Sequence, residues 1–109
     1  MWTYRAKVVN VVDADTLDLL IDLGFHLGFE QRIRLARVNA WETRGSEREK
    51  GLIAKSFVEQ FLPVGDYVAI CTQKKGKFGR YIAEITYGDG LNLSDELVRH
   101  GHAHYHDYG

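Results

Sequence analysis

The sequence predicts a single α+β domain, mainly of β-strands, that closes into a small barrel. Three observations lead to this expectation. The 109 residues, 45% of them hydrophobic, suffice for one domain, residues 1–109, with a small core. Several short stretches rich in Val, Ile and aromatic residues alternate with turn residues, as strands do. One longer stretch instead repeats its apolar residues with the period of a helix.

Five segments carry the strand signals. The first three are expected to form a curled antiparallel meander, because short turns separate them and the second ends at Gly24. The alternation resumes at Phe25 and continues into the strand of Arg34. The expected strands cover residues 4–12, 17–23, 25–35, 67–72 and 80–87.

Two helices are expected between and after these strands. Ser46, with Glu49 three residues later, has the pattern of a capping box at the start of the first helix. The apolar stripe of that helix consists of Ala54, Phe57, Val58 and Phe61, and Pro63 and Gly65 end it. Asn92 is expected to cap a second helix over residues 93–100. Five strands with an intervening helix fit a Greek-key barrel of the OB type with two packed helices.

The composition excludes some classes of protein. A net charge of −1 argues against a basic arm that coats nucleic acid, so any affinity for polyanions requires a local cluster of cations. The lone Cys71 has no partner for an internal disulfide, and its apolar surroundings predict a buried thiol. No segment is long and apolar enough to cross a bilayer, and no signal peptide is visible. The chain as given is therefore expected to be cytoplasmic, with no membrane partner; secretion after removal of a leader stays open.

A strand end carries the first group of candidate site residues. Arg34, Asn39 and Glu42 follow one another where a strand runs out into a loop, which exposes polar side chains. The planar guanidinium group of arginine donates two hydrogen bonds to a phosphate and keeps its charge. A glutamate can hold a water molecule or accept its proton. A charged rim of the strand explains the same pattern equally well.

Two further segments strengthen the functional interpretation. Asp13 and Asp15 lie in an acidic turn before the alternating strand, although aspartate favours turns on its own account. Lys77, Phe78 and Arg80 lie where a later strand begins. A lysine-rich hairpin is usually only a solvated turn, but beside Arg80 it offers phosphate contacts and an aromatic face for a base.

These three segments, in this order, resemble the staphylococcal nuclease family. The family's usual motifs are Asp-Gly-Asp-Thr, Arg-x4-Asp-x-Pro-Glu-Thr and Tyr-Gly-Arg. The resemblance extends from about Val8 to Gly101 and implies the same OB-type barrel. It also implies calcium-dependent hydrolysis of DNA and RNA that leaves a 3′-phosphate. The chain stops about where the family begins a third, C-terminal helix, so a homodimer or a partner chain that covers the exposed surface is considered.

The resemblance also implies individual roles. Asp15, Asn39 and the carbonyl of Ala40 match the ligands of the calcium ion. Glu42 matches the glutamate that positions or activates the water, and Arg34 and Arg80 match the two arginines that grip the phosphate. Lys77 and Phe78 are the expected nucleic-acid contacts, with Phe78 in place of the family's tyrosine.

Two departures from the family pattern bear on activity. Asn39 brings an amide oxygen where the family has a carboxylate, so weaker calcium binding and lower activity are expected. Trp41 replaces a proline before Glu42, which removes a rigid element; its ring either stacks on a base or covers the barrel end. The alternative to a nuclease is therefore a weak or inactive nucleic-acid-binding module of the same fold, or a plain OB barrel that binds single strands. DNA versus RNA, single versus double strand and endo versus exo action stay open.

The last feature is a run of alternating histidines near the C-terminus. His100, His102, His104 and His106 would share one face of a strand and there provide ligands for zinc or nickel. Fraying near the terminus, together with the break at Gly101, is the competing interpretation.

Overall fold

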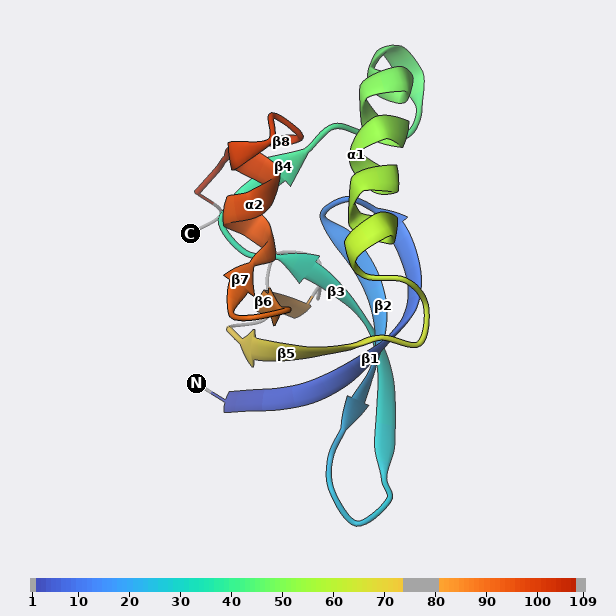
Figure 1. Cartoon of the computed structure of the whole chain (residues 1–109), viewed down its shortest axis with the longest axis vertical. Helices are drawn as coiled ribbons and strands as arrows, with labels where there is room; N and C mark the ends of the chain where they lie inside the picture. The colour runs from blue at the N-terminus through green and yellow to red at the C-terminus, as the bar shows by residue number, and fades with distance from the viewer. Residues whose placement is uncertain (1, 74–80, 108–109) are drawn as a thin grey trace.

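A computed structural model of the chain describes residues 2–73 and 81–107 (Figure 1). Its elements are β1 (Trp2–Asp13), β2 (Thr16–Asp22), β3 (Gly28–Leu35), β4 (Val38–Ala40), a 3-10 turn η1 (Gly45–Glu47), α1 (Arg48–Phe61), β5 (Tyr67–Thr72), β6 (Tyr81–Tyr87), β7 (Leu91–Asn92), α2 (Leu93–Arg99) and β8 (Ala103–Tyr105). Among these residues, no helix is both long and apolar enough to span a membrane.

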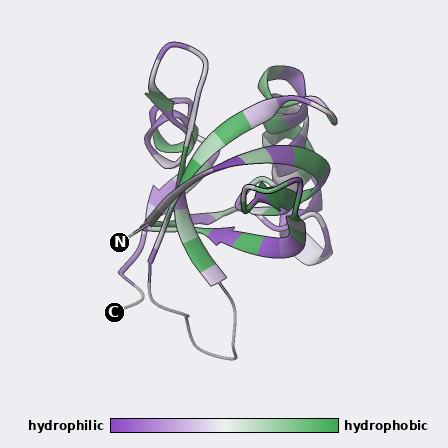
Figure 2. Ribbon diagram, turned by 90° about the horizontal axis from the view of Figure 1, so that it is seen from below, coloured by the Kyte–Doolittle hydropathy of each residue, from purple (hydrophilic) through white to green (hydrophobic). Residues whose placement is uncertain are grey.

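The main sheet closes on itself. Its strands follow the order β3-β2-β1-β5-β6-β7, and a parallel pairing of β3 with β6 joins the two sides. The neighbours β1–β2, β2–β3, β1–β5 and β5–β6 are antiparallel. The predicted fold class, a small five-stranded α+β barrel with two helices, is therefore confirmed. Figure 2 looks along the barrel from below and shows alternating apolar and polar residues along its strands.

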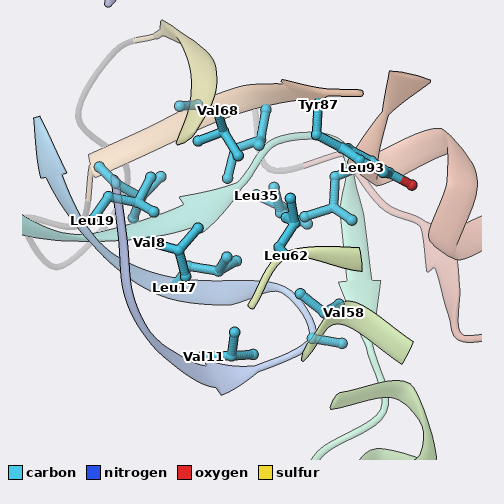
Figure 3. Packing of buried hydrophobic residues seen from close by; sticks show 14 of the residues in the cluster. Val8, Val11, Leu17, Leu19, Leu35, Val58, Leu62, Val68, Tyr87 and Leu93 are labelled. Atoms are coloured by element: carbon cyan, nitrogen blue, oxygen red, sulfur yellow. The ribbon is translucent and has the colours of Figure 1, made fainter. Parts of the chain in front are cut away.

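The core fills the barrel and extends under α1. In β2 the inward residues are Leu17, Leu19 and Ile21, as the alternation predicts. From α1 and its end, Val58 and Leu62 pack against this barrel core (Figure 3). The apolar stripe of α1 differs from the predicted one. Its buried residues are Gly51, Ala54 and Val58, whereas Phe61, which was predicted in the stripe, is exposed. Cys71 is only half-buried, so the expectation of a buried thiol is wrong.

The two helices differ in how their N-termini are capped. Asn92 caps α2 as predicted, since its side chain accepts a hydrogen bond from the Asp95 N–H at 3.0 Å. The capping box predicted at Ser46 is not formed, because Ser46 lies in η1 and α1 begins at Arg48 without a side-chain cap. A 3-10 turn at the start of the helix occupies the residues that the box requires.

The hairpin of β2 and β3 projects well beyond the barrel (Figure 1). The prediction carried the third strand back to Phe25, but β3 begins at Gly28. Phe25 and His26 instead have positive φ angles in the connecting turn, and the Phe25 side chain is 94% exposed. The apolar alternation in this part of the sequence therefore does not mark a buried face.

Arg37 connects the segment after β3 with β6, with α2 and with the residue that follows β8. Its guanidinium group binds Glu84 of β6 at 2.6 Å and Asp95 of α2 at 3.0 Å. The hydrogen bond from Arg37, together with one from the Tyr105 hydroxyl at 2.8 Å, lowers the pKa of Asp95 below its ordinary value. The Arg37 carbonyl also accepts a bond from the His106 N–H at 2.7 Å. This network holds the C-terminal strand β8 beside β4.

Gly51 allows α1 to approach the loop after β4 closely. A Cβ atom built at Gly51 would lie 1.8 Å from the carbonyl oxygen of Glu42 and 2.6 Å from the nitrogen of Thr43. Both neighbours are backbone atoms, which cannot swing aside as a long side chain can. The absence of a side chain at Gly51 thus sets the distance between the helix and the Glu42 segment.

We expect Gly51→Ala to destabilise the fold. Helix propensity alone predicts a gain of about 1 kcal/mol, but the clash with the Glu42 carbonyl should cost about 1–3 kcal/mol. Urea unfolding measures the net change. Ser56→Ala on an exposed position of the same helix is the control and should be neutral or slightly stabilising. A Gly51→Ala protein more stable than the parent would contradict the close approach.

Candidate active site

A buried ion pair lies at the centre of the site. Asp15, in the turn between β1 and β2, is 6% exposed, and Arg34 of β3 is 9% exposed. Asp15 Oδ2 lies 2.9 Å from Arg34 Nη1, and the Leu35 N–H donates to the Asp15 carbonyl at 2.8 Å. The strand register explains why Asp15 and Arg34 meet, because Thr16, the neighbour of Asp15, pairs directly with Arg34 across β2 and β3. Asp15 is therefore a buried residue of this turn, not an exposed one.

The other predicted ligands come from β4. Asn39 Oδ1 accepts a hydrogen bond from Arg34 Nη2 at 3.1 Å, and the Ala40 N–H donates to Asp15 Oδ2 at 2.8 Å. β4 is held by β8, which pairs Asn39 with His104 and Ala40 with Ala103. Sequence reasoning missed this two-stranded sheet. Three-residue strands are too short to show an alternation.

Glu42 follows β4 on an exposed loop whose backbone is fixed from two sides. Its N–H donates to Glu47 Oε1 at 3.1 Å, and its carbonyl faces Gly51 of α1. The next residue, Thr43, donates from its hydroxyl to Asp13 Oδ1 at 2.7 Å. The backbone that carries Glu42 is thus anchored while its carboxylate stays in contact with solvent.

All five predicted site residues in the described part of the chain line one hollow of about 350 Å³, hereafter the Arg34 cavity. Three carboxylates and two guanidinium groups contribute, which leaves one formal negative charge. The lining consists of Asp13, Asp15, Thr16, Arg34, Asn39, Ala40, Trp41, Glu42, Arg44 and His106. Such a polar, partly enclosed hollow suits a phosphate group and water better than an apolar ligand.

Three lining residues, Thr16, Arg44 and His106, were not predicted for this cavity. Arg44 lies two residues after Glu42. The exposed loop predicted around Glu42 was therefore the signal that could have indicated Arg44. His106 reaches the cavity because β8 pairs with β4, which no pattern in the sequence indicates.

Three predicted residues, Lys77, Phe78 and Arg80, lie outside the described residues, and their roles stay predictions. The four alternating histidines do not share a face. His100 and His102 both stack on Phe57, at 4.9 and 4.8 Å between ring centroids, whereas His104 lies 6.0 Å from Trp41. Among residues 2–73 and 81–107, no three His, Cys, Asp or Glu side chains are grouped to hold a metal ion.

The oxygen donors of the cavity fit a hard cation in type. Asp15 offers a carboxylate, Asn39 an amide and Ala40 a backbone carbonyl, which are the ligands that calcium prefers. Arg34 already binds Oδ2 of Asp15 and Oδ1 of Asn39, while Oδ1 of Asp15 accepts one bond, from the Thr16 hydroxyl at 3.0 Å. Asp15 Oδ1 is the carboxylate oxygen with acceptor capacity left for a cation.

The barrel and the Arg34 cavity define a small OB-type domain whose polar site lies where β3, β4 and the acidic turn meet. The chain belongs to the staphylococcal nuclease family, since the family model described as "Staphylococcal nuclease homologue" matches residues 32–109. Members of this family are generally hydrolases that act on nucleic acids. No curated protein matches the chain. Asp15 precedes the matched residues, so its place in the site rests on its contacts with Arg34 and Ala40.

We expect Arg34→Met to destabilise the protein by about 3–5 kcal/mol, because it leaves the Asp15 carboxylate buried without a cation. Adding Asp15→Asn to Arg34→Met should recover much of that loss, since the amide needs no counter-charge. Chemical denaturation of the two single variants and the double variant measures the coupling. Strictly additive losses would show that the two side chains do not depend on each other.

Proposed function

We propose that the chain is a calcium-dependent nuclease that hydrolyses phosphodiester bonds of DNA or RNA. The observation that carries the proposal is the convergence of Arg34, Glu42, Asp15 and Asn39 on one polar cavity. Membership of the family supports the reaction class.

The reaction requires an attacking water, neutralisation of charge on the phosphate and a leaving oxygen. In the proposed mechanism Glu42 holds the water and accepts its proton, while the new P–O bond forms and the bond to the 5′ oxygen breaks. The departing oxygen takes a proton from solvent, which leaves a 3′-phosphate and a 5′-hydroxyl. Because Glu42 is exposed, its carboxylate stays in contact with water before substrate arrives.

The two cavity arginines share the phosphate in this proposal. Arg34 is positioned in advance by Asp15 and Asn39, so no side-chain ordering is needed when charge develops on the phosphoryl oxygens. Arg44 lines the same cavity on an exposed loop and supplies a second cation there. A bound calcium ion, held by Asp15, Asn39 and the Ala40 carbonyl, would add charge neutralisation for the same oxygens.

A specific observation favours the alternative, a weak or inactive binding module. Asp15 is the only one of the three expected ligands with a formal charge, and Arg34 already neutralises it. Affinity for calcium decreases as the number of charged ligands decreases, so the site is expected to need a high calcium concentration. In the alternative, the cavity binds a phosphate without hydrolysing it.

Incubation of plasmid, single-stranded DNA and RNA with calcium should give cleavage that a chelator stops. Glu42→Gln should be slower by about 10²–10⁴-fold, because the amide cannot accept the proton of the water. Glu59→Gln, an exposed change on α1, is the matched control and should cleave like the parent. Equal cleavage rates for the parent and Glu42→Gln would indicate that a contaminating nuclease causes the cleavage.

Asn39→Asp should strengthen calcium binding and raise the cleavage rate at low calcium, because it restores a second charged ligand next to Arg34. Calorimetric titration with calcium measures the affinity, and rates across a calcium series measure the consequence. Gln60→Glu adds the same charge at an exposed position of α1 and should change neither. An Asn39→Asp protein that binds calcium tightly but still cleaves nothing would favour the binding module.

A further inference from the structure

A second hollow lies beside the Arg34 cavity and shares Trp41 with it. It measures about 260 Å³ and is hereafter called the Trp41 pocket. Residues from α1 form one side, and residues just after α2 form the other. The lining consists of Trp41, Lys50, Ile53, His100, Gly101 and His102. None of these residues was assigned to the Arg34 cavity except Trp41, which lines both.

The indole of Trp41 is held in a fixed position. Its Nε1–H donates to the Gly101 carbonyl at 3.2 Å, and its backbone N–H points to the His102 carbonyl at 3.5 Å. The ring of His104 lies tilted at 6.0 Å from it. An aromatic ring fixed in this way loses little freedom when a flat ligand stacks on it, which favours binding.

Lys50 places a cation directly over this ring. Its Nζ lies 4.7 Å from the Trp41 ring centroid, and the side chain is exposed. Within residues 2–73 and 81–107, no ion pair of Lys50 is found. The lysine can therefore exchange its contact with the ring for a contact with an anion without breaking a salt bridge.

The charges around the pocket select the kind of ligand. Among the residues that the structure describes, no carboxylate lines it; the carboxylate of Glu96 lies 3.9 Å from His100 Nε2 at the edge and also binds Arg99 at 2.8 Å. Burial, and secondarily the neighbouring His100, lowers the pKa of His102, so that ring is neutral at pH 7 and offers hydrogen bonds. An aromatic face beside an exposed cation suits a base with its attached phosphate.

We propose that the Trp41 pocket is a subsite for the nucleotide adjacent to the scissile phosphate, with its base on Trp41 and its phosphate on Lys50. The proposal rests on the proposed function for the identity of the strand, since a phosphate in the Arg34 cavity defines which nucleotide is adjacent. Trp41 lines both hollows, so a single strand that passes Arg34 and Glu42 continues onto the indole. Proteins that bind single strands commonly combine such stacking with phosphate contacts.

Equilibrium binding of a fluorescein-labelled thymidine tetranucleotide and of the corresponding mononucleotide, both with a chelator present, tests the subsite without turnover. The parent should bind the tetranucleotide more tightly. Trp41→Ala and Lys50→Ala should each weaken tetranucleotide binding about tenfold and mononucleotide binding much less, while Trp41→Phe keeps most of the affinity. Lys50→Ala should also reduce the slope of log affinity against log salt by about 0.7, the loss of one single-strand phosphate contact.

Lys55→Ala, on the same helix but outside the pocket, is the matched control and should bind both ligands like the parent. Unchanged tetranucleotide affinity in Lys50→Ala and Trp41→Ala, or an equal loss in Lys55→Ala, overturns the subsite. If Trp41→Ala does not fold, the tetranucleotide affinities of Lys50→Ala and Trp41→Phe alone decide whether the subsite exists. If the parent shows this binding pattern but does not cleave nucleic acid with calcium, the proposed hydrolysis is wrong and the subsite is supported. If it cleaves without this binding pattern, the subsite is wrong and the proposed hydrolysis is supported.

Discussion

The buried pair of Asp15 and Arg34 is the constraint on which the site depends. It joins the turn after β1 to β3, and through the Ala40 N–H it also holds β4. A buried ion pair is tolerated only when further hydrogen bonds satisfy its remaining polar atoms. Here Asp15 accepts hydrogen bonds from the Thr16 hydroxyl and the Ala40 N–H in addition to the guanidinium. The pair therefore fixes the acidic turn, β3 and β4 relative to one another.

The same pair limits the chemistry of the cavity. Arg34 neutralises the charged ligand that a cation needs, and its second nitrogen also binds the oxygen of Asn39. The remaining negative charge comes from Asp13 and Glu42, of which Asp13 is held by Thr43. A cation in this cavity therefore competes with Arg34 for the Asn39 oxygen and for the charge of Asp15, whereas an anionic phosphate finds the arginine already in place.

Much of this could be predicted from local patterns. The alternation of Leu17, Leu19 and Ile21 predicted β2 and its inward face, and the Asn92 cap predicted the start of α2. What failed depends on contacts between distant segments. The burial of Asp15 is set by an arginine 19 residues later, and the pairing of β4 with β8 joins strands too short for any period. Arg34, Asn39 and Glu42 line one cavity, and their grouping could be predicted because they follow one another in the chain.

The helix α1 links the two hollows. Gly51 lets its backbone approach the carbonyl of Glu42, and the preceding Lys50 then lies over the ring of Trp41. Trp41 and Glu42 are consecutive, and so are Lys50 and Gly51. One contact between helix and loop therefore positions both Glu42 and the ring of Trp41. A displacement of α1 should therefore change both together. In this barrel the position of one helix sets the distance between the Arg34 cavity and the Trp41 pocket, and therefore between the proposed place of hydrolysis and the proposed place of base stacking.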